Sequence, residues 1–145
     1  MTRESFTRLP GGILAANAIA LGLVGGIQAG LDLLAYFFGL GPMAASLYQL
    51  HEAIGAFEAH SLALLLAILL FHQRSHPGVG WHLTAASIHL LLGTANLLFW
   101  SVFTSNDLIA VGVVATTAHA LFIVLELSAV AIRLYVPVPA PPGRL

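Results

Sequence analysis

Residues 81–103 read WHLTAASIHLLLGTANLLFWSVF, an apolar stretch long enough to form one α-helix across the core of a bilayer. His82, His89 and Asn96 follow one another in it at intervals of seven residues. Seven residues turn an α-helix by about 700°, so the three side chains lie along one face. An ionisable group in hydrocarbon costs at least ~2.5–3.5 kcal/mol. The regular spacing therefore predicts a polar line that faces other helices and avoids lipid.

Two other apolar stretches carry polar residues at the same interval. Residues 47–71 contain His51 and Glu58, and His72 follows in the same register just beyond the stretch. Residues 108–135 carry a longer line, which consists of Gly112, His119, Glu126 and Arg133. Each stretch is predicted to be an α-helix with one polar face, and the chemistry of the protein is expected on these faces.

The composition indicates a protein that crosses a membrane several times. Of the 145 residues, 59% are hydrophobic and only 8% are charged, whereas soluble domains carry about 25% charged residues. The sequence has no cysteine, which excludes disulfides, thiolate metal sites and cysteine-ligated iron–sulfur clusters. A formal net charge of −1 provides no basic surface for nucleic acid. The expected partner is the lipid bilayer.

Four membrane spans follow from the lengths of the apolar stretches. They are placed at residues 12–38, 47–71, 81–103 and 108–135. The connections between them contain glycine, proline or short polar residues, which interrupt helices. Residues 1–136 are expected to form one domain, and the proline-rich residues 137–145 are expected to form a disordered tail.

The arginines set the expected orientation in the membrane. All basic residues flank the spans on one side, and they are Arg3, Arg8, Arg74, Arg133 and Arg144. Basic residues near the ends of spans favour the cytoplasmic side. The prediction is an all-α, integral membrane four-helix bundle in a bacterial-type inner (cytoplasmic) membrane. It runs up-down-up-down, with both termini in the cytoplasm (N-in, C-in).

Counting residues from the predicted membrane boundaries sorts the polar side chains by depth. An inner layer contains Asn17, His89 and Glu126. A middle layer contains Gln28, Glu58, Asn96 and His119. The outer rim contains Asp32, His51 and Glu52, and the inner rim contains His72, His82 and Arg133.

Four of these residues carry most of the chemistry, and they are Glu58, His89, His119 and Glu126. Two carboxylates and two imidazoles from different helices are ligands that a helical bundle uses for a transition metal ion. The same groups also suit a hydrogen-bonded proton relay, which would be extended by Gln28, Asp32, His51 and Asn96. A third interpretation is that these groups only join the helices, by hydrogen bonds of about 0.6 kcal/mol each.

His60 and His119 indicate a different cofactor. They lie on different helices at nearly the same predicted depth, which is the minimum requirement for the two axial ligands of a haem b. The expected function is therefore haem- or metal-dependent redox chemistry in the membrane, by this chain alone or as a subunit of a membrane complex. The alternatives are proton or small-solute conduction through the same residues, and a structural or assembly subunit without a cofactor.

Overall fold

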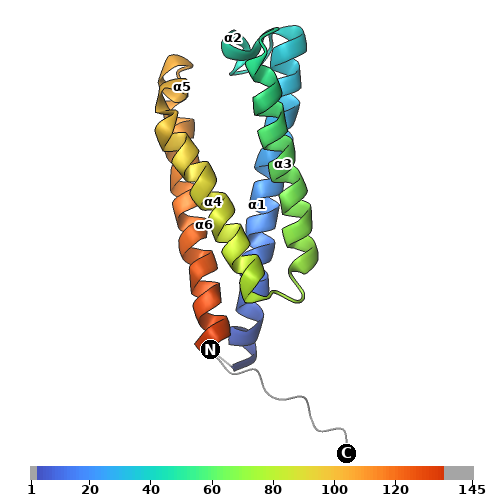
Figure 1. Ribbon diagram of the computed structural model, residues 1–145, viewed down its shortest axis with the longest axis vertical. Helices are drawn as coiled ribbons and strands as arrows, with labels where there is room; N and C mark the ends of the chain where they lie inside the picture. The colour runs from blue at the N-terminus through green and yellow to red at the C-terminus, as the bar shows by residue number, and fades with distance from the viewer. Residues whose placement is uncertain (1–2, 136–145) are drawn as a thin grey trace, which may run out of the picture.

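The computed structural model describes residues 3–135, with side chains from Arg8 onward, and over this range it consists of helices and short connections without a strand (Figure 1). The all-α class predicted from the sequence is confirmed for these residues. The long helices are α1 (Arg3–Phe38), α3 (Glu52–Gln73), α4 (Val79–Leu98) and α6 (Ile109–Tyr135). The short helices are α2 (Ala44–Leu47) and α5 (Trp100–Ser105). The proline-rich segment at residues 137–145 lies outside the described residues.

The helix boundaries differ from the predicted spans. α1 begins nine residues earlier than the predicted span 12–38, at Arg3, because hydropathy reports the length that lipid covers and not the length of the helix. α3 begins at Glu52 because Gln49 adopts a left-handed φ of 53°, which separates it from α2. The third predicted span is divided at Phe99, where φ is −104° and ψ is 31°, and the chain continues as α5.

A glycine ends α1 where the sequence predicts a break. Gly39 has a φ of 63°, in the left-handed region that residues other than glycine rarely adopt. Its N–H still donates to the Ala35 carbonyl oxygen at 3.0 Å, which closes the last turn of the helix. The chain then turns through α2 and returns as α3.

The four long helices pack as two hairpins. α1 lies along α3, which we call the first hairpin, and α4 lies along α6, which we call the second hairpin. The two hairpins approach each other at the end that holds the start of α1, the end of α6 and the connection at residues 74–78 (Figure 1). They diverge toward α2 and α5. We call these ends the terminal end and the loop end. α1 also contacts α6, so it joins the two hairpins.

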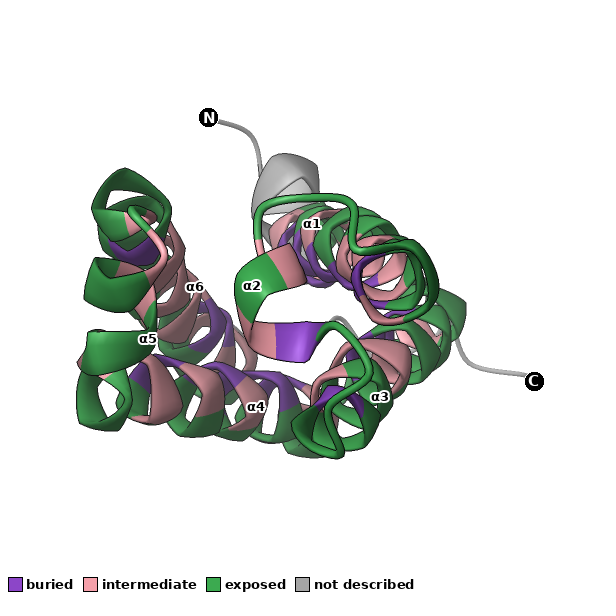
Figure 2. Cartoon of the chain, turned by 90° about the horizontal axis from the view of Figure 1, so that it is seen from above, coloured by how far each residue is buried: buried purple, intermediate pink, exposed green. Residues whose placement is uncertain are grey.

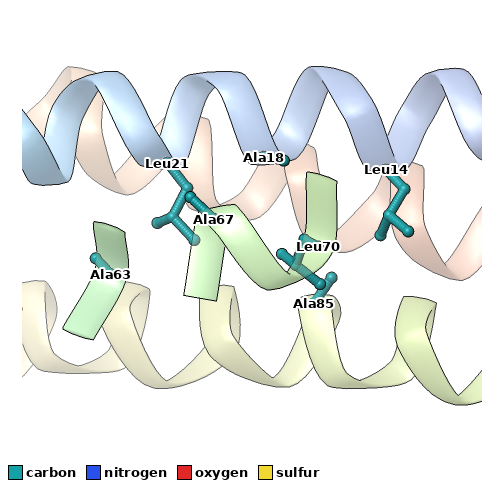
Figure 3. Close-up of a cluster of buried hydrophobic side chains, with 7 residues drawn as sticks. All are labelled: Leu14, Ala18, Leu21, Ala63, Ala67, Leu70 and Ala85. Atoms are coloured by element: carbon teal, nitrogen blue, oxygen red, sulfur yellow. The ribbon is translucent and has the colours of Figure 1, made fainter. Parts of the chain in front are cut away.

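An interface of small side chains holds the first hairpin together. The buried cluster contains Leu14, Ala18 and Leu21 of α1 and Ala63, Ala67 and Leu70 of α3, and Ala85 of α4 packs against it (Figure 3). Small side chains allow helix backbones to approach closely. Gly25 belongs to the same contact, because a Cβ atom there would lie only 2.9 Å from the backbone oxygen of His60. This close approach fixes which face of α3 points toward α1.

The outer surface of the helices is apolar. Within the described residues, three segments are long and apolar enough to cross a membrane, namely Arg8–Phe38 of α1, Glu52–Gln73 and Ile109–Tyr135. α4 is less apolar because it carries the polar line that begins at His82. Large apolar side chains are exposed on all four long helices, while buried residues face the neighbouring helices (Figure 2). These features fit a protein that lies in a membrane.

Candidate functional site

Polar side chains are buried where the two hairpins meet. Asn17 of α1, His82 and His89 of α4, and Glu126 of α6 are each at most 3% exposed. Burying polar groups among apolar helices is costly unless each group finds a hydrogen-bond partner. The partners of these four side chains are mainly one another.

Glu126 is the centre of this group. The Nδ2 group of Asn17 donates a hydrogen bond of 2.6 Å to its Oε1. Nδ1 of His82 lies 2.5 Å from its Oε2, and both of these side chains are completely buried. The imidazole and the carboxyl group therefore share a hydrogen inside the molecule. Through these two contacts Glu126 joins α6 to both α1 and α4.

His89 extends the connection to a fifth side chain. Its Nε2 group donates to Oδ1 of Asn17 at 2.7 Å, and its Nδ1 lies 2.9 Å from Nδ1 of His119. The His89 ring also stacks on Phe122, with ring centroids 4.9 Å apart and planes inclined by 14°. The result is a continuous hydrogen-bonded series, called the polar chain below, that runs His82–Glu126–Asn17–His89–His119.

The hydrogens of the polar chain point toward Glu126. Because Oδ1 of Asn17 only accepts, His89 carries its hydrogen on Nε2, and neutral His89 accepts at Nδ1 from the Nδ1–H of His119. Asn17 then donates to the carboxyl group from one side and His82 from the other. Convergent donors of this kind stabilise a carboxylate. The same arrangement leaves Nε2 of His119 with a free lone pair.

The polar chain has an open position near the terminal end. Nε2 of His82 has no hydrogen-bond partner among residues 3–135, although the side chain is completely buried. His82 lies in the first turn of α4, directly after the connection at residues 74–78. This nitrogen is therefore the buried polar atom of the polar chain that lies nearest to the terminal end and still lacks a partner in the described residues.

The other end of the polar chain borders a cavity of ≈ 540 Å³ between the two hairpins, which is partly open to the surface of the molecule. Its walls come from α1 and α6, with His89 contributed by α4. Three polar side chains, Gln28, His89 and His119, interrupt an otherwise apolar lining. The cavity extends toward the loop end, where Leu31 and Ala110 line it.

The chain matches no family model, no curated protein and no solved structure.

A second histidine–carboxylate pair lies within the first hairpin. Nδ1 of His60 donates to Oδ2 of Asp32 at 2.6 Å, and the two side chains are 35% and 4% exposed. The sequence places Asp32 at the outer rim and proposes His60 as a haem ligand. In the structure these two residues instead join α3 to α1.

The structure brings together the three residues that the sequence assigns to one inner layer. Asn17, His89 and Glu126 come from three helices and are linked directly, and His119 is linked to them through His89. The sequence places His82 at the inner rim, but the structure buries it against Glu126. The signal that could have found it was the seven-residue line that His82 shares with His89.

Glu58 does not reach the other predicted metal ligands. It is exposed on α3, because that helix turns Ala63, Ala67 and Leu70 toward its neighbours (Figure 3). Glu58 precedes Ala63 by five residues, which is about 140° around the helix. The polar line of the second predicted span therefore faces outward, whereas those of the third and fourth face the polar chain.

The remaining relay candidates occupy separate places. Gln28 lines the cavity, and Asp32 is held by His60. His51 is exposed at the start of α3, and Asn96 is half-buried in the last two turns of α4. These side chains do not extend the polar chain in the described residues.

The geometry gives little support to a metal or haem site. Among residues 3–135 no three histidine, aspartate or glutamate side chains are grouped so that they could hold a metal ion. His60 and His119 belong to different hairpins, and each hydrogen-bonds to a partner in its own hairpin. Both would have to leave these partners to act as an axial pair.

Proposed function

We propose that this protein is a small four-span membrane protein that conducts protons between the terminal end and a cavity inside the membrane. Its four long helices run up-down-up-down in a bacterial-type inner membrane, with both termini in the cytoplasm. The single observation that carries the proposal is the unbroken polar chain, which contains four titratable side chains and ends at the cavity. Ionisable groups inside a membrane are expensive and are typical of proton relays.

The polar chain and the cavity lie in series along the helices. His82 and His89 are two helical turns apart, so the chain covers about 10 Å of a bilayer core of about 30 Å. The cavity continues from His119 toward the loop end. Together they provide a route through most of the membrane when water or a solute fills the cavity.

Proton uptake would begin at His82. In the state with a carboxylate at Glu126 and a neutral imidazole, Nε2 of His82 holds a lone pair and accepts a proton from the terminal end. The Nδ1 hydrogen then moves along the 2.5 Å contact to Oε2 of Glu126. The result is a neutral carboxyl group beside a neutral imidazole, so the proton that was taken up is now held by Glu126.

Asn17 does not itself carry the proton, because an amide has no ionisable hydrogen. A water molecule that enters when Asn17 turns aside would accept the proton from Glu126 and donate one to Nε2 of His89, in the state where His89 carries its hydrogen on Nδ1. The Nδ1 hydrogen of His89 then moves to Nδ1 of His119, and the Nε2 hydrogen of His119 leaves into the cavity. Glu126 is then a carboxylate again, and tautomer exchange of the three imidazoles resets the polar chain.

Haem- or metal-dependent redox chemistry has weaker support, because the polar chain already engages three of the proposed metal ligands with one another. The exposed apolar surface supports the lipid bilayer as the partner of this protein. Assembly with other membrane subunits is a separate proposal.

The proposed orientation predicts a labelling pattern. Because the natural chain has no cysteine, single cysteines at Ser5 and Ser105 report only on their own positions. A membrane-impermeant maleimide should label the first only from the cytoplasmic side and the second only from the outer side, in right-side-out and inverted vesicles. Labelling of both positions from one side would contradict the four-span arrangement.

Replacing His89 by phenylalanine tests conduction. The new ring preserves the stacking on Phe122 but removes both hydrogen bonds in the middle of the polar chain. In proteoliposomes with a potassium gradient, valinomycin and an entrapped pH dye, proton flux should fall at least tenfold. His76→Phe is the matched control. His76 is exposed and does not belong to the polar chain, so its replacement should leave the proton flux unchanged.

The thermal unfolding midpoint of both variants should be measured in detergent. It shows whether each variant is folded, so that a lower proton flux is not caused by unfolding. A folded His89→Phe protein with normal proton flux would refute the proposal.

A further inference from the structure

The cavity at the end of the polar chain has the size and lining of a site for a small lipid-soluble molecule. Its volume of ≈ 540 Å³ lies within the range of about 300–1,000 Å³ that is typical of ligand sites. Its lining is apolar apart from three side chains, so a charged occupant would lose its hydration without compensation. The occupant is therefore uncharged and mainly apolar.

His119 specifies the polar part of this occupant. The Nδ1–H of His119 donates to Nδ1 of His89, so Nε2 of His119 holds a lone pair. This nitrogen has no hydrogen-bond partner within the described part of the chain. A lone pair on a cavity wall needs a donor, such as the hydroxyl group of a ligand. Gln28, from α1, adds an amide that both donates and accepts.

These requirements separate two kinds of lipid-soluble molecule. An acyl chain of a phospholipid would fill the apolar volume but would leave His119 and Gln28 unpaired inside the membrane, which is costly. An aromatic ring with hydroxyl groups and an apolar tail satisfies both the lining and the two polar side chains. Aromatic stacking against Phe122, which also lines the cavity, suits such a ring.

We propose that the cavity binds a quinol-type lipid, with one ring hydroxyl donating a hydrogen bond to Nε2 of His119. The inference rests on the proposed function and deepens it, because it names the molecule that occupies the cavity and hydrogen-bonds to the end of the polar chain. No electron transfer is involved in this binding step, and the hydroxyl keeps its hydrogen in the bound state. The corresponding quinone has only carbonyl acceptors, so it binds less well to the same nitrogen.

Binding can be measured on the full chain in lipid nanodiscs under argon. The probes are decylubiquinol, its oxidised form decylubiquinone, and decylbenzene, which has the tail and a ring but no oxygen. Affinity is obtained by titration calorimetry. Decylubiquinol should bind at one per chain and at least tenfold more tightly than either of the other probes.

Three variants locate the site. His119→Phe keeps a ring but removes the acceptor, and Ala118→Phe fills the cavity from the same helix. Both should weaken decylubiquinol binding at least tenfold. The matched control is Ala120→Phe, since Ala120 is exposed on α6 and does not line the cavity. It should bind decylubiquinol like the natural protein.

The results distinguish this inference from the proposed function. Equal affinities for decylbenzene and decylubiquinol would show that the cavity selects only apolar volume, and this would overturn the inference. Equal affinities for decylubiquinone and decylubiquinol would also overturn it. An unchanged affinity of His119→Phe for decylubiquinol would have the same consequence. Absence of decylubiquinol binding together with a proton flux that depends on His89 would overturn only the quinol site. Tight, His119-dependent binding without any proton flux would support the quinol site and overturn proton conduction.

Discussion

Glu126→Gln is expected to reduce proton flux in proteoliposomes at least tenfold while the protein stays folded. Glutamine has nearly the same volume as glutamate and retains a side-chain oxygen that can accept from Asn17 or His82, the two partners of the carboxyl group. It cannot take up and release a proton. The substitution therefore removes the only carboxyl group of the polar chain and keeps most of its hydrogen bonds.

Glu58→Gln is the matched control for this experiment, because it makes the same chemical change on an exposed face of α3. Its flux should equal that of the natural protein. Normal flux in Glu126→Gln would show that the polar chain only holds the helices together. An equal loss in both variants would show that the loss does not arise from the polar chain.

The largest effect on stability is expected when only one member of the His82–Glu126 pair is removed. Both side chains are completely buried, and their atoms lie 2.5 Å apart. Glu126→Leu or His82→Leu alone leaves the partner without its counterpart, which costs about 3–5 kcal/mol for a buried pair. The double substitution removes both polar groups and should recover most of that loss, because apolar replacements of buried pairs are often neutral.

The free energy of unfolding in mixed micelles, measured for the natural protein and the three variants, gives the coupling between the two residues. We expect a coupling of at least about 2 kcal/mol, since residues that share a buried hydrogen bond are strongly non-additive. Additive losses would mean that the two side chains do not share a hydrogen. The double variant would still leave the Nδ2 group of Asn17 without its acceptor, so full recovery is not expected.

Periodicity predicted the helices well and their ends less well. A seven-residue repeat of polar residues inside an apolar stretch requires an α-helix with one polar face, whatever the helix packs against. The ends depend on backbone conformations such as the left-handed φ of Gln49 and the divided helix at Phe99, which hydropathy does not report. The short helices α2 and α5 arise at these points.

The candidate site was predicted in part. Counting residues along the helices was enough to place Asn17, His89 and Glu126 at one level, because each residue of a helix advances the chain by a constant rise. It could not show that His82 turns inward to the carboxyl group. His119 was assigned one layer away from His89, although the two imidazoles are in direct contact.

The order of the residues alone shows that this protein is helical, apolar enough for a membrane, and carries histidine and glutamate on its helix faces. These properties follow from composition and from the period of the α-helix, and both are local. Which of the polar faces meet depends on how the helices pack against one another. Small residues such as Ala63 and Ala67 bring α3 against α1, and this contact turns Glu58 away from the other polar faces. The rotation of each helix about its axis depends on packing against its neighbours, and no single helix contains that information.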